Sequence, residues 1–302
     1  MTMINLPYLT CLPDEPMKNH TTLGIGGPVR EMYFPETTDC MIKLCEMLQE
    51  QEKTPFVMGN GSNLLVDDKE LDIIVINTSK LRNIKLTETV SDNYKITADS
   101  GVLLSELAVF AQKHALTGFE FAHGIPGTLG GAVVMNAGAY DGEMKDVVHS
   151  TVTYNREKGV QTITGEQHEF AYRSSVFSNS GDIILSSVIR LKKGDKEAIK
   201  EKMNRLAIRR RESQPLDIKS AGSTFKRPKE GFAAALIEQA GLKGFSIGGA
   251  QVSEKHAGFV INTGNATFKD FISVMEHVQD VVLKNSGITL EPEVKILRYH
   301  KY

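Results

Sequence analysis

The sequence predicts an α+β fold built from several lobes, not one doubly wound parallel sheet. Its 302 residues are enough for two or three domains at roughly 150 residues per domain. Strand patterns occur along the whole chain but do not alternate strictly with helical patterns, as a doubly wound sheet would require. Boundaries are expected near 78–82 and 192–195, where apolar strands give way to polar, lysine-containing turns.

Five stretches place apolar residues at helical spacing. The first follows Thr38 and Asp39, which are suited to cap it. The third ends near Arg209, Arg210 and Arg211, where cations suit the helix dipole, and this basic run is interpreted as a solvated helix face. The five predicted helices are 39–49, 103–115, 195–212, 232–240 and 267–285.

Short runs of β-branched and apolar residues predict strands between these helices. Eight such runs are present: 56–58, 64–66, 73–76, 94–98, 147–154, 183–191, 258–261 and 294–297.

Composition narrows the class of protein. Hydrophobic residues make up 41% and charged residues 24% of the chain, which excludes a disordered protein. The 35 Lys and Arg residues against 37 Asp and Glu residues leave a net charge of −2, so charge gives no reason to expect a nucleic-acid partner. Three cysteines are too few for a disulfide framework, and neither they nor the histidines have zinc-ligand spacing. We therefore expect no metal.

Nothing in the sequence predicts a membrane protein. No apolar run approaches the roughly 20 residues that cross a bilayer. Residues 1–19 have no basic region and no continuous apolar region, so we expect no signal peptide there. A cytoplasmic location is expected.

The segment Gly59-Asn60-Gly61-Ser62-Asn63 lies between two predicted strands. Glycines two residues apart allow backbone N–H groups to converge on a phosphate, and Ser62 and Asn63 add side-chain donors. A tight hairpin is the alternative, because Asn-Gly is a strong hairpin signal.

A second segment is richer in glycine. Between 124 and 142, six of nineteen residues are glycine, and they include Gly124, Gly127, Gly130 and Gly131. Such density is typical of a backbone that a ligand must approach closely, although a glycine-rich packing corner is the alternative. The segment has neither the dinucleotide pattern of a Rossmann turn nor a Walker lysine. Two such loops in one chain favour an extended diphosphate such as FAD.

Three polar positions elsewhere are candidates for chemistry. Arg173 follows Tyr172 in a short polar turn and suits an anion. Ser223 directly follows a glycine and lies near Lys226, and Glu293 lies at the start of the last predicted strand. A surface ion pair, a turn-closing serine and a strand-edge carboxylate are the alternatives.

Taken in order, these segments resemble the UDP-N-acetylenolpyruvoylglucosamine reductases, bacterial enzymes of peptidoglycan precursor synthesis. The resemblance covers nearly the whole chain, and six motifs in the right order make it specific. Its markers, after an opening stretch at 20–27, are 59–63, 124–127, 136–140, Tyr172-Arg173, Gly222-Ser223 and 292–294.

The resemblance implies a two-lobe FAD-binding fold of the vanillyl-alcohol oxidase type, followed by a third α+β domain that binds substrate. The expected lobes are 1–80, joined by the C-terminal strand 291–302, then 81–192, with the substrate domain at 193–290. The strand at 294–297 is expected to pack with the first lobe.

The resemblance also implies roles for individual residues. Arg173, Ser223 and Glu293 are the implied catalytic residues, and Lys226 is an implied substrate contact. The implied FAD-binding residues are Gly59, Asn60, Gly61, Ser62, Asn63, Gly124, Ile125, Pro126, Gly127, Thr128, Gly130, Gly131, Asn136, Ala137 and Gly138.

The implied activity is NADPH-dependent reduction of an enolpyruvyl nucleotide sugar on non-covalent FAD, which serves cell wall synthesis and hence cell shape and division. A monomer is expected. The alternatives are another FAD-dependent oxidase or dehydrogenase of the same fold, and a non-catalytic nucleotide-sugar-binding protein.

The sequence departs from the longer members in two places. Only 49 residues separate Arg173 from Ser223, which leaves no room for the inserted loop whose tyrosine closes over the substrate. This chain is therefore similar to the shorter class, with the tyrosine role unassigned. Arg227 also stands where the family often has asparagine.

Overall fold

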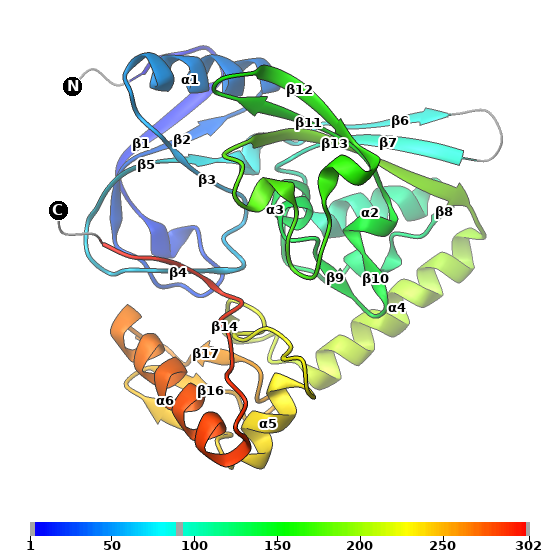
Figure 1. The fold of residues 1–302 in the computed structure, drawn as a ribbon. Helices are drawn as coiled ribbons and strands as arrows, with labels where there is room; N and C mark the ends of the chain where they lie inside the picture. Colours follow the sequence, from blue (N-terminus) through cyan, green and yellow to red (C-terminus); the bar gives the residue numbers. More distant parts are fainter. Residues whose placement is uncertain (1–3, 89–92, 300–302) are drawn as a thin grey trace. The chain divides into compact units, whose positions relative to one another are not determined.

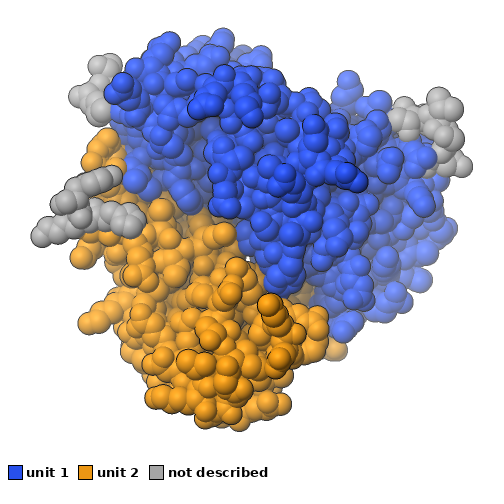
Figure 2. Space-filling model, in the orientation of Figure 1, with its two compact units in different colours: residues 1–13, 31–60, 73–209 blue, residues 14–30, 61–72, 210–302 orange. Residues whose placement is uncertain are grey.

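The computed structural model describes residues 4–88 and 93–299. The chain divides into two compact units, which Figure 2 colours separately. Unit 1 comprises residues 1–13, 31–60 and 73–209, and unit 2 comprises residues 14–30, 61–72 and 210–302. The division into lobes 1–80, 81–192 and 193–290 stays a prediction.

The larger core of unit 1 is built on an antiparallel sheet of six strands, with β13 (Ile183–Lys193) near its centre. In Figure 1, β12, β11, β13, β7 and β6 lie side by side in that order. Helix α2 (Leu104–Lys113) buries Leu104, Leu107 and Ala111 in this core. The other strands are β6 (Ile84–Glu88), β7 (Asn93–Asp99), β8 (Leu116–Thr117), β11 (Val148–Asn155) and β12 (Gly159–Thr164).

A second core in unit 1 lies under helix α1 (Thr38–Glu50). The cap of this helix is Thr37, one residue before the predicted Thr38, and its side chain accepts from the backbone N–H of Cys40 at 3.1 Å. The helix covers a four-stranded sheet in the order β1-β2-β5-β3, in which β3 pairs with β5 in parallel. The strands are β1 (Leu9–Pro16), β2 (Pro28–Pro35), β3 (Phe56–Met58) and β5 (Leu71–Asn77).

Unit 2 has one core, formed mainly by helix α6 (Phe268–Ser286) and a small antiparallel sheet. The helix begins at a capping box between Thr267 and Asp270 and ends at Gly287, whose φ is 72°. The sheet has the order β14-β17-β16-β15, and α5 (Ala233–Gln239) packs beside it. Its strands are β14 (Lys219–Ser220), β15 (Ser246–Ile247), β16 (Ala250–Val252) and β17 (Val260–Asn262).

The C-terminal strand β18 (Lys295–Leu297) pairs in parallel with β4 (Leu64–Val66). This is the pairing with the first 80 residues that the sequence predicts, and both strands belong to unit 2.

All five predicted helices are present, with ends within two residues of those expected. Helix α4 (Lys196–Ser213) buries Ile199 and Met203. Arg209 and Arg211 of its basic run are exposed, as predicted, but Arg210 is partly buried. Helix α3 (Leu129–Val134) was not predicted, because Gly130 and Gly131 make its sequence resemble a loop. Within 4–88 and 93–299, no helix combines the length and the apolar character needed to span a membrane.

One histidine lies within the larger core of unit 1. His168 is 1% exposed, its ring stacks on Phe170, and its Nδ1 lies 3.0 Å from the carbonyl of Gly165. Because a carbonyl only accepts, Nδ1 carries the proton. Nε2 therefore accepts from the hydroxyl of Thr151, whose Oγ1 lies 3.0 Å away. Burial lowers the pKa of His168 below 6.5, so the folded protein holds the ring neutral.

We predict that this buried ring makes the protein less stable in acid. The unfolded chain binds a proton at His168 near pH 6.5 while the folded chain resists it, so the free energy of unfolding falls as the pH drops through that value. Urea unfolding at about pH 7.5 and about pH 5.5 should show a larger fall for the wild type than for His168→Gln. His123, His149 and His256 also have lowered pKa values, so only the difference between the two proteins counts. Equal falls would contradict the prediction.

Candidate functional site

The two glycine-rich segments, far apart in sequence, contact each other in unit 1. The side-chain amide of Asn60 donates to the carbonyl of Pro126 at 2.8 Å. A Cβ built on Gly59 would lie 2.1 Å from Oγ1 of Thr128, so only glycine fits there. The hairpin alternative for Gly59–Asn63 is wrong, because β3 and β4 belong to different sheets.

The first segment presents backbone donors. The N–H groups of Asn60, Gly61 and Ser62 donate to no other residue that the structure describes. Gly61 has a φ of 60°, and a Cβ there would lie 2.2 Å from the carbonyl oxygen of His20. Its glycine is therefore required by the turn itself, and the turn leaves three consecutive N–H donors without a described acceptor, an arrangement that suits an anion.

The second segment presents further donors at the start of α3. The N–H groups of Gly127, Thr128 and Gly131 also donate to no other described residue. The hydroxyls of Ser100 and Thr128 are buried and have no partner among the described residues. Buried polar atoms of this kind require an explanation, and an oxygen-rich ligand such as FAD supplies one. The residues present therefore fit FAD.

Glycine occurs in the second segment for two different structural reasons. A Cβ on Gly130 would lie 2.8 Å from Cβ of Ser100, and one on Gly142 would lie 2.6 Å from the ring of Phe121. The packing-corner alternative thus accounts for these two. Gly131 is exposed, and the nearest atom to a Cβ there is Oγ1 of Thr128 at 3.7 Å. Packing does not require glycine at 131, which leaves approach of a ligand as its reason.

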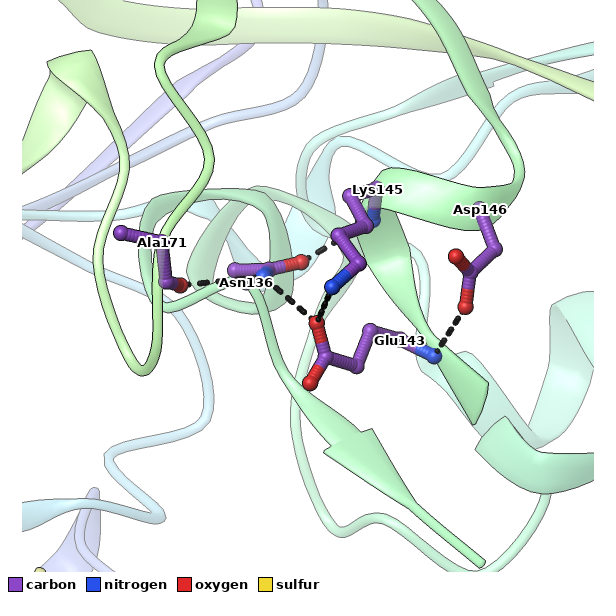
Figure 3. Close-up of polar contacts among 5 residues, drawn as sticks. All are labelled: Asn136, Glu143, Lys145, Asp146 and Ala171. Atoms are coloured by element: carbon purple, nitrogen blue, oxygen red, sulfur yellow. Dashed lines mark hydrogen bonds and ion pairs between the residues drawn. The ribbon is translucent and has the colours of Figure 1, made fainter. Parts of the chain in front are cut away.

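Asn136 is fully engaged within unit 1. Its side chain is 1% exposed, donates to Glu143 Oε2 and to the carbonyl of Ala171, both at 3.0 Å, and accepts from the N–H of Lys145 at 2.9 Å (Figure 3). Any contact of Asn136 with FAD is thus left to its backbone. Gly138 pairs with Glu143 across the two short strands β9 (Gly138–Ala139) and β10 (Gly142–Glu143).

Arg173 lies at the tip of a tight turn in unit 1. Ala171 and Ser174 close the turn by backbone hydrogen bonds, and Arg173 has a φ of 52°. Its guanidinium donates to the carbonyl of Gly138 at 3.4 Å and lies 5.2 Å from the ring centre of Tyr172. A cleft of about 350 Å³ opens here, lined by 138–143, Lys145, Asp146, Tyr172 and Arg173.

Ser223 and Glu293 lie on neighbouring segments of unit 2. The N–H of Glu293 donates to the carbonyl of Thr224 at 2.8 Å. The carbonyl of Glu293 accepts from the side chain of Asn63 at 3.1 Å, which also connects it to the first glycine-rich segment. Ser223 follows Gly222, whose φ is 75°, and its exposed hydroxyl bonds no other described residue.

Lys226 continues the same pairing. Its N–H donates to the carbonyl of Glu291 at 2.8 Å, and its ammonium contacts the carboxylate of Glu291 at 3.2 Å. Arg227 places its guanidinium 4.1 Å from the ring centre of Phe232. Lys226 and Arg227, three and four residues after Ser223, are thus held by partners within unit 2.

The structure therefore brings some of the predicted site residues together, but not all of them. It brings Asn60 to Pro126, and it pairs Glu293 with Thr224, the residue after Ser223, while Arg173 belongs to unit 1. The sequence reasoning missed Ser100 and Glu143. A signal existed for Ser100, because Ser100-Gly101 follows a predicted strand and precedes a predicted helix, where ligand-binding turns commonly occur. No group of three or more metal-binding side chains occurs in the part of the chain that the structure describes.

Comparison with known proteins agrees with this geometry. At the level of protein class, it shows that the chain contains a FAD-binding domain. The profile of a FAD-binding domain matches residues 30–164, and that of the UDP-N-acetylenolpyruvoylglucosamine reductase C-terminal domain matches residues 214–297. Similarity to a cholesterol oxidase from Brevibacterium sterolicum, with a TM-score of 0.50 and 15% identity over 64% of this chain and 40% of that one, shows the fold alone.

The relatives are more specific. The UDP-N-acetylenolpyruvoylglucosamine reductases of Caldanaerobacter subterraneus and Agathobacter rectalis are 50% and 46% identical, over 94% and 97% of this chain and 92% and 95% of theirs. The crystal structure of that enzyme from Thermus caldophilus aligns with a TM-score of 0.80 and 32% identity, over 96% of this chain and 98% of that one. The chain belongs to the UDP-N-acetylenolpyruvoylglucosamine reductase family.

Gly131 allows a clean test of the FAD loop. We expect Gly131→Ala to fold normally, since a methyl group meets no close neighbour and alanine favours a helix. The same methyl group should obstruct a ligand at the N–H of residue 131 and weaken FAD binding by about tenfold. Titration of the apoprotein with FAD, followed by flavin fluorescence, measures this.

Gly264→Ala is the matched control, because a Cβ there meets nothing within 4 Å and the residue lies outside both glycine-rich segments. If Gly131→Ala binds FAD as tightly as the control, Gly131 does not contact the cofactor.

Proposed function

We propose that the chain reduces the enolpyruvyl group of UDP-N-acetylglucosamine enolpyruvate to the lactyl ether, with NADPH as reductant, and that Arg173, Ser223 and Glu293 carry out the chemistry on the substrate. The product is UDP-N-acetylmuramate, a peptidoglycan precursor. The activity and its FAD cofactor follow from family membership. The observation that carries the residue assignment is the backbone pairing that places Glu293 beside Thr224.

A bound FAD would supply hydride transfer, taking hydride from NADPH and delivering it to the terminal methylene carbon of the enolpyruvyl group. The free backbone donors of Asn60, Gly61 and Ser62, and those of Gly127 and Thr128, would hold its pyrophosphate. Ser100 and Thr128 would add hydroxyls that otherwise lack a partner among the described residues.

Arg173 stabilises negative charge on the substrate. When the methylene carbon is reduced, charge spreads onto the substrate carboxylate. A guanidinium stays protonated and offers two parallel donors, so it suits that carboxylate better than a lysine would. The turn at Ala171–Ser174 presents the side chain into the cleft, which gives the anion access to it.

Ser223 supplies the proton. Its hydroxyl is exposed and bonds no other described residue, so it is available to a substrate. A serine hydroxyl is a weak acid, but an enolate is a strong base, and a well-placed donor suffices. Lys226 would contact the substrate.

Glu293 assists in a protonated or proton-sharing form. An ionised carboxylate beside an enolate would repel it, whereas a protonated one donates a hydrogen bond. Its backbone is held by two hydrogen bonds, one to Thr224 and one from Asn63. The position of its Cα is therefore fixed.

We also propose that the protein acts as a monomer in the cytoplasm. Its nucleotide-sugar substrate and NADPH are highly charged, and such molecules do not cross a bilayer unaided. Cys40 and Cys45 are free thiols, as suits a reducing compartment. Analytical ultracentrifugation tests the monomer.

A non-catalytic nucleotide-sugar sensor and another flavoenzyme of this fold are the competing functions. Purified protein that is yellow, bleaches with NADPH and recovers its colour on addition of the enolpyruvyl substrate favours the reductase. Bleaching without recovery would favour another flavoenzyme, and binding without bleaching would favour a sensor.

We predict that Ser223→Ala separates the two half-reactions. Reduction of the flavin by NADPH should remain nearly unchanged, because the hydroxyl takes no part in it. Reoxidation by the enolpyruvyl substrate should slow by about 10²–10⁴-fold, the usual loss when a positioned general acid is removed. Stopped-flow absorbance follows both steps.

Ser246→Ala is the control, since Ser246 is an exposed serine of unit 2 on β15. Equal slowing of both half-reactions in Ser223→Ala would mean that Ser223 supports the site or the fold and does not donate the proton.

A further inference from the structure

The turn that carries Arg173 needs support from outside itself. Arg173 has a φ of 52°, a left-handed conformation that is unfavourable for a non-glycine residue. Its long side chain also has many rotamers, so neither backbone nor side chain is fixed by local preference. Whatever holds the turn therefore determines where the guanidinium lies.

Asn136 holds the base of that turn. The carbonyl of Ala171 closes the turn by accepting from the N–H of Ser174, and it also accepts from Nδ2 of Asn136 at 3.0 Å. The same Nδ2 donates to Oε2 of Glu143 at 3.0 Å, and Oδ1 accepts from the N–H of Lys145 (Figure 3). One buried amide thus joins the Arg173 turn to the β9–β10 hairpin.

Glu143 lies on that hairpin and, like Arg173, lines the cleft. It is the partner of Gly138 across the hairpin, and Arg173 donates to the carbonyl of Gly138 at 3.4 Å. The ammonium of Lys145 at 2.8 Å, the amide of Asn136 and the charge of Arg173 together lower the pKa of Glu143. The carboxylate is therefore ionised at neutral pH and attracts the guanidinium.

We propose that Glu143 and Asn136 are positioning residues for Arg173. Asn136 fixes the turn through Ala171, and the Glu143 carboxylate keeps the guanidinium at the mouth of the cleft, where a substrate carboxylate would meet it. This inference rests on the proposed function of Arg173. A purely structural brace would instead affect folding and FAD binding and leave the chemistry on bound substrate unchanged.

The test compares Glu143→Gln with Glu169→Gln. The first keeps the shape and the hydrogen-bond acceptor for Asn136 but removes the negative charge that pairs with Lys145 and attracts Arg173. Glu169 is exposed, lies four residues before Arg173 and has no bond to Asn136 or to the hairpin, so its substitution is the matched control.

In Glu143→Gln we expect flavin content, thermal unfolding and the rate of flavin reduction by NADPH to match the control. Reoxidation by the enolpyruvyl substrate should slow by roughly 10- to 100-fold, because a misplaced charged group loses that much in rate. Unchanged reoxidation would overturn the inference, as would loss of flavin together with normal reoxidation of the molecules that keep it.

A double-mutant cycle with Arg173→Gln identifies the residue through which Glu143 acts. Glu143→Gln should slow reoxidation strongly in the wild type and hardly at all when Arg173 is already replaced. Equal slowing in both backgrounds would overturn the inference and leave the proposed function intact. If Arg173→Gln alone does not slow reoxidation, it is the proposed role of Arg173 that fails.

Glu143→Asp serves if Glu143→Gln does not fold. The shorter carboxylate keeps the charge but withdraws it from Asn136 and Arg173, so reoxidation should slow while flavin reduction does not. Wild-type reoxidation in the Glu143→Asp variant would overturn the inference.

Discussion

The close approach of Gly59 to Thr128 is the constraint on which the arrangement of the two glycine-rich segments depends. No side chain fits at 59, because a Cβ would lie 2.1 Å from Oγ1 of Thr128. The contact brings the end of β3 to the start of α3, and Asn60 then bonds the carbonyl of Pro126. Free backbone donors of both segments, at Asn60 and at Gly127, are thereby gathered in one unit. A diphosphate has charge on several oxygens, so donors from two segments suit it better than donors from one.

Glycine density has two physical causes here, and a sequence alone cannot separate them. Gly130 and Gly142 are required because neighbouring side chains fill the space a Cβ would need. Gly131 has no such neighbour and carries an N–H that bonds no other described residue. The first kind keeps the segment compact, and only the second is open to a ligand. Counting glycines correctly predicts an unusual backbone, but the positions that face a ligand emerge only from the three-dimensional surroundings.

The sequence predicted the long, periodic elements well, because helices such as α1 and α6 carry an apolar stripe and clear caps. It missed α3, whose glycines carry no such stripe, and β1, whose prolines and acids suggest a loop. Motif order predicted the family and named candidate catalytic residues. The pairing of Glu293 with Thr224, and that of β18 with β4, depends on long-range backbone hydrogen bonds, and no local pattern encodes them.

Side-chain length explains why the candidate catalytic residues are supported in different ways. The hydroxyl of Ser223 is one bond from Cβ, so fixing the backbone beside Thr224 and Glu293 nearly fixes the proposed proton donor. The guanidinium of Arg173 is several rotatable bonds from its backbone, and an unsupported arginine would lose about 2 kcal/mol of rotamer freedom on binding an anion. The network of Asn136, Glu143 and Lys145 supplies that support before a substrate arrives. A short acid can thus rely on backbone bonds, whereas a long cation requires charged neighbours that are themselves hydrogen-bonded.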